Sequence, residues 1–367
     1  MTVVDATLID SWADDLQGPV ALHIRQTLTS VEGEDGVIFP PTYAMKDGRI
    51  GAPYAIDELK DGKNVVQIDS VGSQANRMEP LFQRSPEGSP KNPLAELVPQ
   101  IEIEISGDFT LSILEVGHRL GDALIRSSEL NKEAKKAFAD FAERGDAMGI
   151  ARLAPTSLVF GAWDSRGEGA KLPRILQAVI RAWDVDMLRR SAQYVPAIDY
   201  AKADVFTAED KQKAEGDTKN PLAQQGFVHV PAVDTHGGVV VRGGIYRDVT
   251  VNLIALRQLS APEKGGILRR YILGLALLAA TQAQDGFLRQ GCLLTPDPKA
   301  KPSWTLVERN GNRLELSFDS EFLMRYSRDR AKEFGIAEGR RVKFSRDSAR
   351  ADVAAKTEKK KGGKQKA

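Results

Sequence analysis

The sequence has little of the chemistry that disulfide frameworks and metal sites need. It contains one cysteine, Cys292, and four histidines in 367 residues. A single cysteine excludes an intrachain disulfide framework and a zinc site with several thiolates, which matches a reducing compartment. Because the histidines are also scattered, we expect no metal and no other cofactor.

Long apolar runs and familiar enzyme motifs are absent too. The longest apolar stretch, 271–280, is far shorter than the ~20 residues that a transmembrane helix needs. The N-terminus lacks the basic start and apolar centre of a secretion signal, so we expect a cytoplasmic protein. Gly-rich phosphate loops, HExxH, GxSxG and CxxC motifs do not occur. Any catalysis would therefore have to rest on residues outside these motifs.

The charge is nearly balanced but unevenly distributed. The chain has 51 Lys and Arg against 50 Asp and Glu. Seven of these bases and only two of the acids lie in 350–367, so the rest of the chain is slightly acidic. A site for a polyanion must therefore be local. The central stretches 151–195 and 240–290, each with seven bases, are where we expect it.

Residue patterns predict several strands and helices. Alternating apolar and polar residues predict strands at 20–28, 101–105 and 249–253. Asn310-Gly311 predicts a tight hairpin between 304–308 and 313–318. Apolar residues at helical spacing predict helices at 113–125, 172–187 and 268–278.

The order of these elements favours an α+β fold over a doubly wound parallel sheet. We expect a single domain over 1–349, interrupted by irregular insertions at 29–64 and 202–238 that are long enough to be functional. Within the second insertion, the almost wholly polar segment 202–226 predicts a mobile loop. The Lys-rich tail, 350–367, is predicted to be disordered.

Three segments combine groups that could hold a nucleic acid. Residues 71–80 place Gln74, Asn76 and Arg77 beside small residues, although a capped helix start explains them as well. In 160–174, Trp163 precedes Lys171 and Arg174 across a Gly-rich turn, an arrangement that can stack a base and hold a phosphate. Trp163 fits a core position too. The third segment, 241–247, places Arg242 before paired glycines, as an ordinary β-turn also would.

Other polar groups allow two interpretations each. Asp184 and Asp186 could bind a metal, but their arginine neighbours favour a solvated, salt-bridged surface. His118 beside Arg119 could act as a general base, contact a phosphate or ribose, or remain a surface group. Arg25 lies on the polar side of the predicted strand 20–28, whose exposed face is basic.

Five strings together resemble a known family. They are VGSQANRMEP (71–80), GHRLGDALIRSS (117–128), LVFGAWDS (158–165), KLPR (171–174) and RSAQYVPA (190–197). In this order they resemble the backbone subunit of type I-G (formerly I-U) CRISPR interference complexes, a member of the RAMP superfamily. The resemblance leaves out the Lys-rich tail. It implies a ferredoxin-like, RNA-recognition-type palm whose long insertions form a finger and a thumb; which insertion is which stays open.

The resemblance also implies a function. It implies a non-catalytic subunit that binds CRISPR RNA, polymerises with further copies into a helical filament, joins the other subunits of the complex and presents the guide to target DNA. The matching positions implied as guide contacts are Gln74, Asn76, Arg77, His118, Arg119, Arg126, Lys171 and Arg174. The residue patterns described above add Arg25, Trp163 and Arg242. No membrane partner is expected.

Two other functions remain open. A RAMP-type ribonuclease acting on guide or target RNA would use Asp164, His118, Asp184 or Asp186. A generic protein whose basic tail alone binds nucleic acid would lose all binding on truncation after Arg350.

Overall fold

The computed structural model describes residues 2–43, 54–107, 109–164, 169–283 and 285–363. It is a mixed α+β fold built around a curled, mainly antiparallel sheet of ten strands, the main sheet. The strands run in the order β1-β14-β13-β2-β10-β7-β4-β3, with β12 beside β2 and β11 beside β12. Their bounds are β1 Thr2–Val3, β2 Ala21–Ser30, β3 Ile56–Glu58, β4 Asn64–Asp69, β7 Leu176–Trp183, β10 Ile245–Asn252, β11 Phe287–Arg289, β12 Cys292–Pro296, β13 Ser303–Val307 and β14 Arg313–Ser317.

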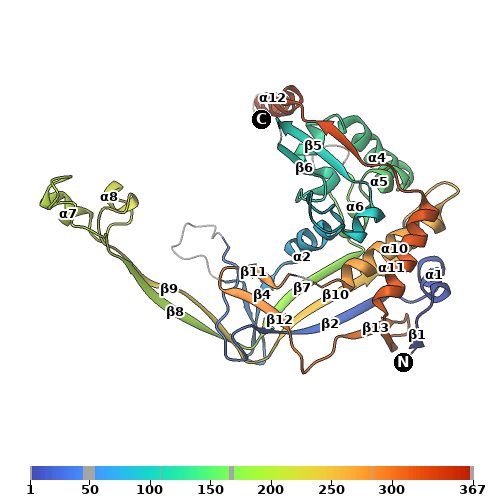
Figure 1. The fold of residues 1–367 in the computed structure, drawn as a ribbon, viewed down its shortest axis with the longest axis horizontal. Coiled ribbons are helices and arrows are strands. Elements are labelled where there is room, and N and C mark those ends of the chain that lie inside the picture. Colours follow the sequence, from blue (N-terminus) through green and yellow to red (C-terminus); the bar gives the residue numbers. More distant parts are fainter. Residues whose placement is uncertain (1, 44–53, 108, 165–168, 284, 364–367) are drawn as a thin grey trace.

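Helices cover one face of the main sheet (Figure 1). They pack there because alternate strand residues are apolar: Ile245, Val249 and Val251 of β10 are buried on the same side. The longest helix of this layer, α10, buries nearly its whole surface between the sheet and α11. The helices near the sheet are α1 Ala6–Asp14, α2 Val71–Met78, α9 Leu253–Arg257, α10 Gly265–Thr281 and α11 Ser320–Phe334.

A second, smaller sheet lies beyond this helical layer (Figure 1). Its strands are β15 Arg340–Lys343, β5 Ile101–Ser106 and β6 Phe109–Ser112. The helices of this part are α3 Ala123–Arg126, α4 Asn131–Arg144, α5 Met148–Leu153, α6 Pro155–Phe160 and α12 Arg346–Gly363, with 3-10 helices η1 Glu79–Phe82, η2 Pro93–Leu97 and η3 Arg119–Gly121. Residues 350–363 of the tail, which was predicted to be disordered, belong to α12.

A two-stranded arm projects from the main sheet where the neighbouring strands β7 and β10 meet it, at one end of each (Figure 1). It is formed by β8 Val185–Tyr194 and β9 Val230–Val241, which pair antiparallel. Two short helices, α7 Ala208–Ala214 and α8 Pro221–Gln224, cap its tip around a small apolar cluster of their own. The segment 202–226, predicted to be a mobile loop, therefore contains helices and a small core.

Several predicted elements are confirmed and two are wrong. The strands at 20–28, 101–105 and 249–253, the helix at 268–278 and the Asn-Gly hairpin are present as β2, β5, β10, α10 and β13–β14. The helix predicted at 172–187 is instead strand β7 followed by the start of β8. Consecutive residues Ala178, Val179 and Ile180 are all buried, and a strand covered on both faces has the continuous apolar pattern of a buried helix.

The helix predicted at 113–125 is also wrong. This segment instead contains η3 and the first residues of α3, separated by a turn. Gly121 marks the break: a Cβ there would lie 2.8 Å from the carbonyl oxygen of Trp163, so the backbone approaches another loop closely.

No described helix is both long enough and apolar enough to cross a membrane.

Candidate nucleic-acid interface

Four of the five resembling strings meet at one place in the fold. The buried side chain of Arg119 in η3 is the centre of this contact. Its Nη2 donates to Asn76 Oδ1 at 3.2 Å, and its Nη1 donates to the carbonyl oxygen of Gly161 at 3.2 Å. Segments separated by tens of residues in the sequence are thus held together by one guanidinium group.

Arg119 is held in an unusual conformation by a buried partner. Its Nε lies 2.7 Å from Glu79 Oε2, and the two side chains are 5% and 2% exposed. The guanidinium also lies over the Phe160 ring, 5.4 Å from its centre. Arg119 has a φ of 54°, which is uncommon for a residue with a side chain. Such strain persists only where surrounding contacts impose it, and it is typical of functional sites.

Burial changes the ionisation of this pair. It raises the pKa of Glu79 to about 7, although the Arg119 charge and hydrogen bonds oppose the shift. Burial likewise lowers the pKa of Arg119, and the nearby positive charge of Arg174 acts in the same direction. The pair therefore lies beneath a locally positive surface.

Exposed groups surround this buried pair. Trp163 is 60% exposed, and the Lys171 ammonium lies 5.9 Å from the centre of its ring. The two residues form a β-bridge, which fixes the ring beside the cation. Asn76, His118 and Arg174 are exposed as well. We call Asn76, His118, Trp163, Lys171 and Arg174 the Trp163 surface.

Glycines permit the close packing of this surface. Gly161 has a φ of 78°, in the left-handed region that favours glycine, and a Cβ there would lie 2.8 Å from Arg174 Cγ. The chain returns from this turn through a hydrogen bond from Leu172 N to the Ala162 carbonyl oxygen at 2.8 Å. Arg174 is thereby brought back beside the η3 segment. Among the described residues, neither Lys171 nor Arg174 has a carboxylate partner.

The other predicted cations are engaged by carboxylates. Arg25 makes a two-point contact with Asp248, with Nε 2.7 Å from Oδ1 and Nη2 3.2 Å from Oδ2. Arg242 Nε lies 2.9 Å from Asp186 Oδ2 at the base of the arm, an exposed ion pair of the kind expected there. Both arginines remain more than half exposed, so a phosphate can still compete for them.

Arg77 and Arg126 are more enclosed. Arg77 Nε donates to the buried Asp69 at 3.1 Å, and its Nη2 donates to the Leu288 carbonyl oxygen at 2.7 Å. Arg126 is buried, with Nε 3.8 Å from Asp352 Oδ2. These side chains join elements of the fold and lie outside the Trp163 surface.

Gln74 faces a different part of the molecule. It is 1% exposed and joins Asp69 to Arg247: Nε2 donates to Asp69 at 2.7 Å and Oε1 accepts from Arg247 Nε at 3.1 Å. Sequence reasoning missed Arg247. A signal was present, because Arg247 lies two residues from both Ile245 and Val249 and so shares the buried face of the strand with these apolar residues.

The candidate acid groups do not assemble into a metal site. Among the residues that the structure describes, no group of three or more His, Cys, Asp and Glu side chains could hold a metal ion. Asp186 is paired with Arg242, and Asp184 lies in the β7–β8 turn with a φ of 53°.

Residues 22–187 match the family model described as CRISPR-associated protein GSU0053. The match supports a Cas protein. It implies a role in CRISPR defence, and its span includes every residue of the Trp163 surface as well as Glu79 and Arg119. No curated protein matches the chain.

Proposed function

We propose that this Cas protein is a non-catalytic backbone subunit that binds CRISPR RNA, polymerises along it and presents it for pairing with target DNA. The observation that carries the proposal is the Trp163 surface within the matched residues. It combines an exposed aromatic ring with Lys171 and Arg174, two cations that have no carboxylate partner in the part of the chain that the structure describes. Aromatic rings stack on bases of any sequence, and cations bind the phosphates between them.

The composition of this surface suits a guide-holding role. Asn76 and His118 add side-chain groups that can hydrogen-bond to ribose or phosphate oxygens. Contacts of this kind position a strand without reading its sequence. In a guide complex, base pairing reads the sequence, so the Trp163 surface needs only to hold and display the strand.

The arm supports polymerisation. Nearly all of β8 is exposed, and large apolar side chains lie at its last residue and just beyond it: Tyr194 is 51% exposed, Val195 65% and Ile198 54%. An isolated two-stranded ribbon is marginally stable in water, and exposed apolar groups on it mark a surface for a partner. We assign the arm as the thumb, the main sheet as the ferredoxin-like palm, and a neighbouring copy as the partner of the arm.

Filter binding of labelled single-stranded RNA over a salt series tests the Trp163 surface. Lys171→Ala with Arg174→Ala should lower the slope of log affinity against log salt by about 2, roughly one for each lost phosphate contact. The matched control is Lys132→Ala with Lys135→Ala, which removes two exposed lysines from α4. Equal losses in the two double variants would contradict the proposal.

Two further experiments test the alternative functions. Truncation after Arg350 should leave RNA binding largely intact; complete loss would assign binding to the tail alone. Incubation of guide and complementary RNA with and without magnesium should leave both strands whole. Cleavage that His118→Ala or Asp164→Asn abolishes would identify a ribonuclease instead.

Electron microscopy of protein co-expressed with a CRISPR array tests assembly directly. We expect repeated copies along one RNA. Particles that contain a single copy on each RNA would contradict a backbone role.

A further inference from the structure

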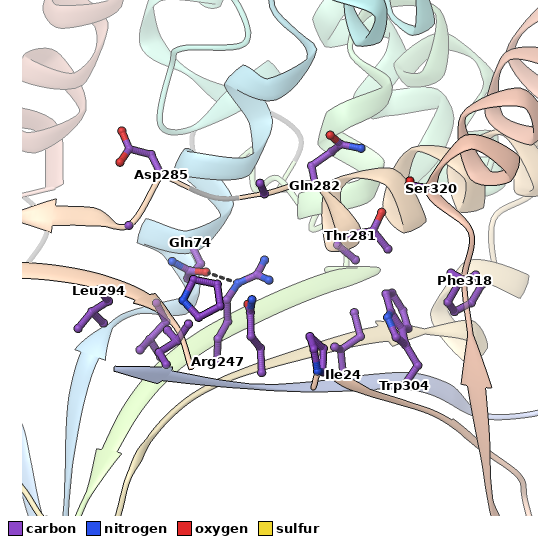
Figure 2. A pocket seen from close by; sticks show the side chains of 18 of the residues that line it. Ile24, Gln74, Arg247, Thr281, Gln282, Asp285, Leu294, Trp304, Phe318 and Ser320 are labelled. Atoms are coloured by element: carbon purple, nitrogen blue, oxygen red, sulfur yellow. Dashed lines mark hydrogen bonds between the residues drawn. The ribbon is translucent and has the colours of Figure 1, made fainter. Parts of the chain in front are cut away.

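A cavity of about 480 Å³ lies on the helix-covered side of the main sheet, away from the Trp163 surface. Figure 2 shows its lining: Arg247 and Gln74 lie at one end, and Trp304 and Phe318 lie at the other. Thr281, Gln282, Ala283, Asp285, Gly286 and Leu288 also line the cavity. A mainly apolar cavity of this size with a few polar groups is typical of a small-ligand site, for which about 300–1,000 Å³ is usual.

Arg247 is the central polar group of the cavity. It lies in the middle of the sheet, directly between Gln26 of β2 and Ile180 of β7, and is 4% exposed. Its Nε donates to Gln74, and its Nη2 lies 3.5 Å from the weak acceptor Met78 Sδ. No carboxylate among the described residues pairs with Arg247. A buried charge without strong acceptors is costly, so this guanidinium favours a ligand that supplies them.

The neighbouring Asp69 carboxylate does not supply Arg247 with a direct acceptor. The nearest carboxylate in the network is Asp69, which accepts hydrogen bonds from Gln74, Arg77 and Arg289. Arg247 reaches Asp69 only through the Gln74 amide. Arg77 and Arg289 thus contact the buried Asp69 carboxylate directly, whereas Arg247 does not. Burial lowers the pKa of Arg247 to about 10, which leaves it charged at neutral pH.

The entrance of the cavity is also basic. A shallow depression shares Gln282 and Ser320 with the cavity and is lined further by Arg325 and Arg328. Arg328 is exposed, and Arg325 lies 3.8 Å from Glu321. Phosphates can therefore remain in water at the entrance while an uncharged group passes inward.

We propose that this cavity receives one base of a single-stranded nucleic acid and prefers guanine. The terminal nitrogens of Arg247 can donate to guanine O6 and N7, the pair of acceptors that arginine contacts most often. Adenine presents an amino donor at the position of O6, which repels a guanidinium. The rings of Trp304 and Phe318 supply apolar contact, and Arg325 with Arg328 holds the flanking phosphates. The proposal deepens the RNA-binding function and rests on it.

Isothermal titration of the full chain with GMP and with AMP tests the preference. We expect GMP to bind about 5- to 150-fold more tightly, the discrimination given by one two-point arginine contact. Arg247→Met should abolish the preference, and Arg247→Lys should reduce it because an ammonium lacks the paired donors. Equal binding of GMP and AMP by the wild type, or a preference retained in Arg247→Met, would overturn the proposal.

A second variant covers the case in which a buried Arg247 substitution prevents folding. Ser320→Glu places a negative charge at the entrance, where it should weaken GMP binding at least several-fold. An acid in the first turn of α11 is compatible with the helix dipole, so this variant should fold. Ser89→Glu is the control, since Ser89 is exposed and does not line the cavity. Equal GMP affinity in these two variants would contradict the site.

The outcomes separate this proposal from the RNA-binding function. Absence of GMP binding, together with RNA binding that depends on Lys171 and Arg174, would overturn the cavity proposal alone. A Ser320→Glu variant that loses self-association but keeps GMP affinity would instead assign the cavity to a second copy of the chain. Loss of the GMP preference with intact RNA binding in Arg247→Met supports the proposal.

Discussion

Arg119 Nε lies 2.7 Å from Glu79 Oε2, and this buried pair joins the end of α2 to the η3 segment beneath the Trp163 surface. Removing one partner of a buried pair leaves the other charge uncompensated, which typically costs about 3–5 kcal/mol. The pair therefore fixes the geometry of the surface above it. We therefore expect variants at Glu79 and Arg119 to lower the stability of the fold, and to weaken RNA binding as a consequence of that loss.

Glu79 should make stability depend on pH. Its pKa is raised from 4.5 to about 7 by burial, so the folded state binds a proton more tightly than the unfolded state does. This stabilising contribution is complete below about pH 4.5 and is lost as the pH rises to about 7, a difference of about 3 kcal/mol at most. Urea unfolding at several pH values measures it.

Glu79→Gln provides the comparison for this prediction. The amide keeps the shape of the side chain but does not titrate. The stability difference between wild type and variant should therefore change between about pH 4.5 and pH 7 and stay constant above that range. A difference that is constant over the whole range would show that Glu79 does not titrate there.

Trp163 should contribute to RNA binding and little to stability. Base stacking on an aromatic side chain is worth about 1–3 kcal/mol, so Trp163→Ala should weaken binding of a short RNA by about 5- to 150-fold. Because Trp163 is 60% exposed, the free energy of unfolding should change by less than about 1 kcal/mol. Phe109→Ala is the control, since Phe109 is 56% exposed on the smaller sheet. Similar affinities of the two variants would exclude Trp163 as a stacking platform.

The sequence predicted correctly those elements whose conformation is determined by their own residues. The hairpin forms at Asn310-Gly311, where Gly311 has a positive φ of 88° and Asn310 does not, and α10 has a long apolar pattern. Strand β7 was misread because its environment, covered on both faces, is a property of the assembled sheet. Its apolar residues do not distinguish that strand from a buried helix.

The candidate site was only partly predictable for a similar reason. The alternation in β2 placed Arg25 on an exposed face, but its partner Asp248 is 223 residues away in the sequence. Gln74 and Arg247 are 173 residues apart, so nothing local indicates that they meet beneath the sheet. The resembling strings identified Arg119, and the pattern of 160–174 identified Trp163, whereas only the fold shows that one is buried and the other is exposed.

Arg242 and Asp186 should have opposite effects on RNA binding. Their ion pair is more than half exposed, so either alanine variant should change the free energy of unfolding by less than about 1 kcal/mol. If Arg242 contacts a phosphate, Arg242→Ala weakens RNA binding and lowers its salt slope by about 1. Asp186→Ala frees the arginine and should strengthen binding slightly. Losses of equal size in both variants would assign the pair a structural role in the arm.

The tip of the arm, 195–229, should be required for assembly but not for folding or for binding a short RNA. Tyr194 and Val230 lie directly opposite each other in the ribbon, so 195–229 can be replaced by Asn-Gly, which closes a two-residue hairpin. The apolar cluster at the tip, Ala214, Ala223 and Val228, is separate from the two larger cores, so its removal should leave their stability unchanged.

The shortened chain should bind an RNA long enough for one copy as tightly as the intact chain does. On a longer RNA it should no longer form ordered multimers, because the apolar groups following Tyr194 are lost together with the contact to the next copy. Light scattering after gel filtration, with and without long RNA, measures both species. Multimers of unchanged size would show that neighbouring copies associate through another surface. Weaker binding of the short RNA would instead place the arm on the RNA itself.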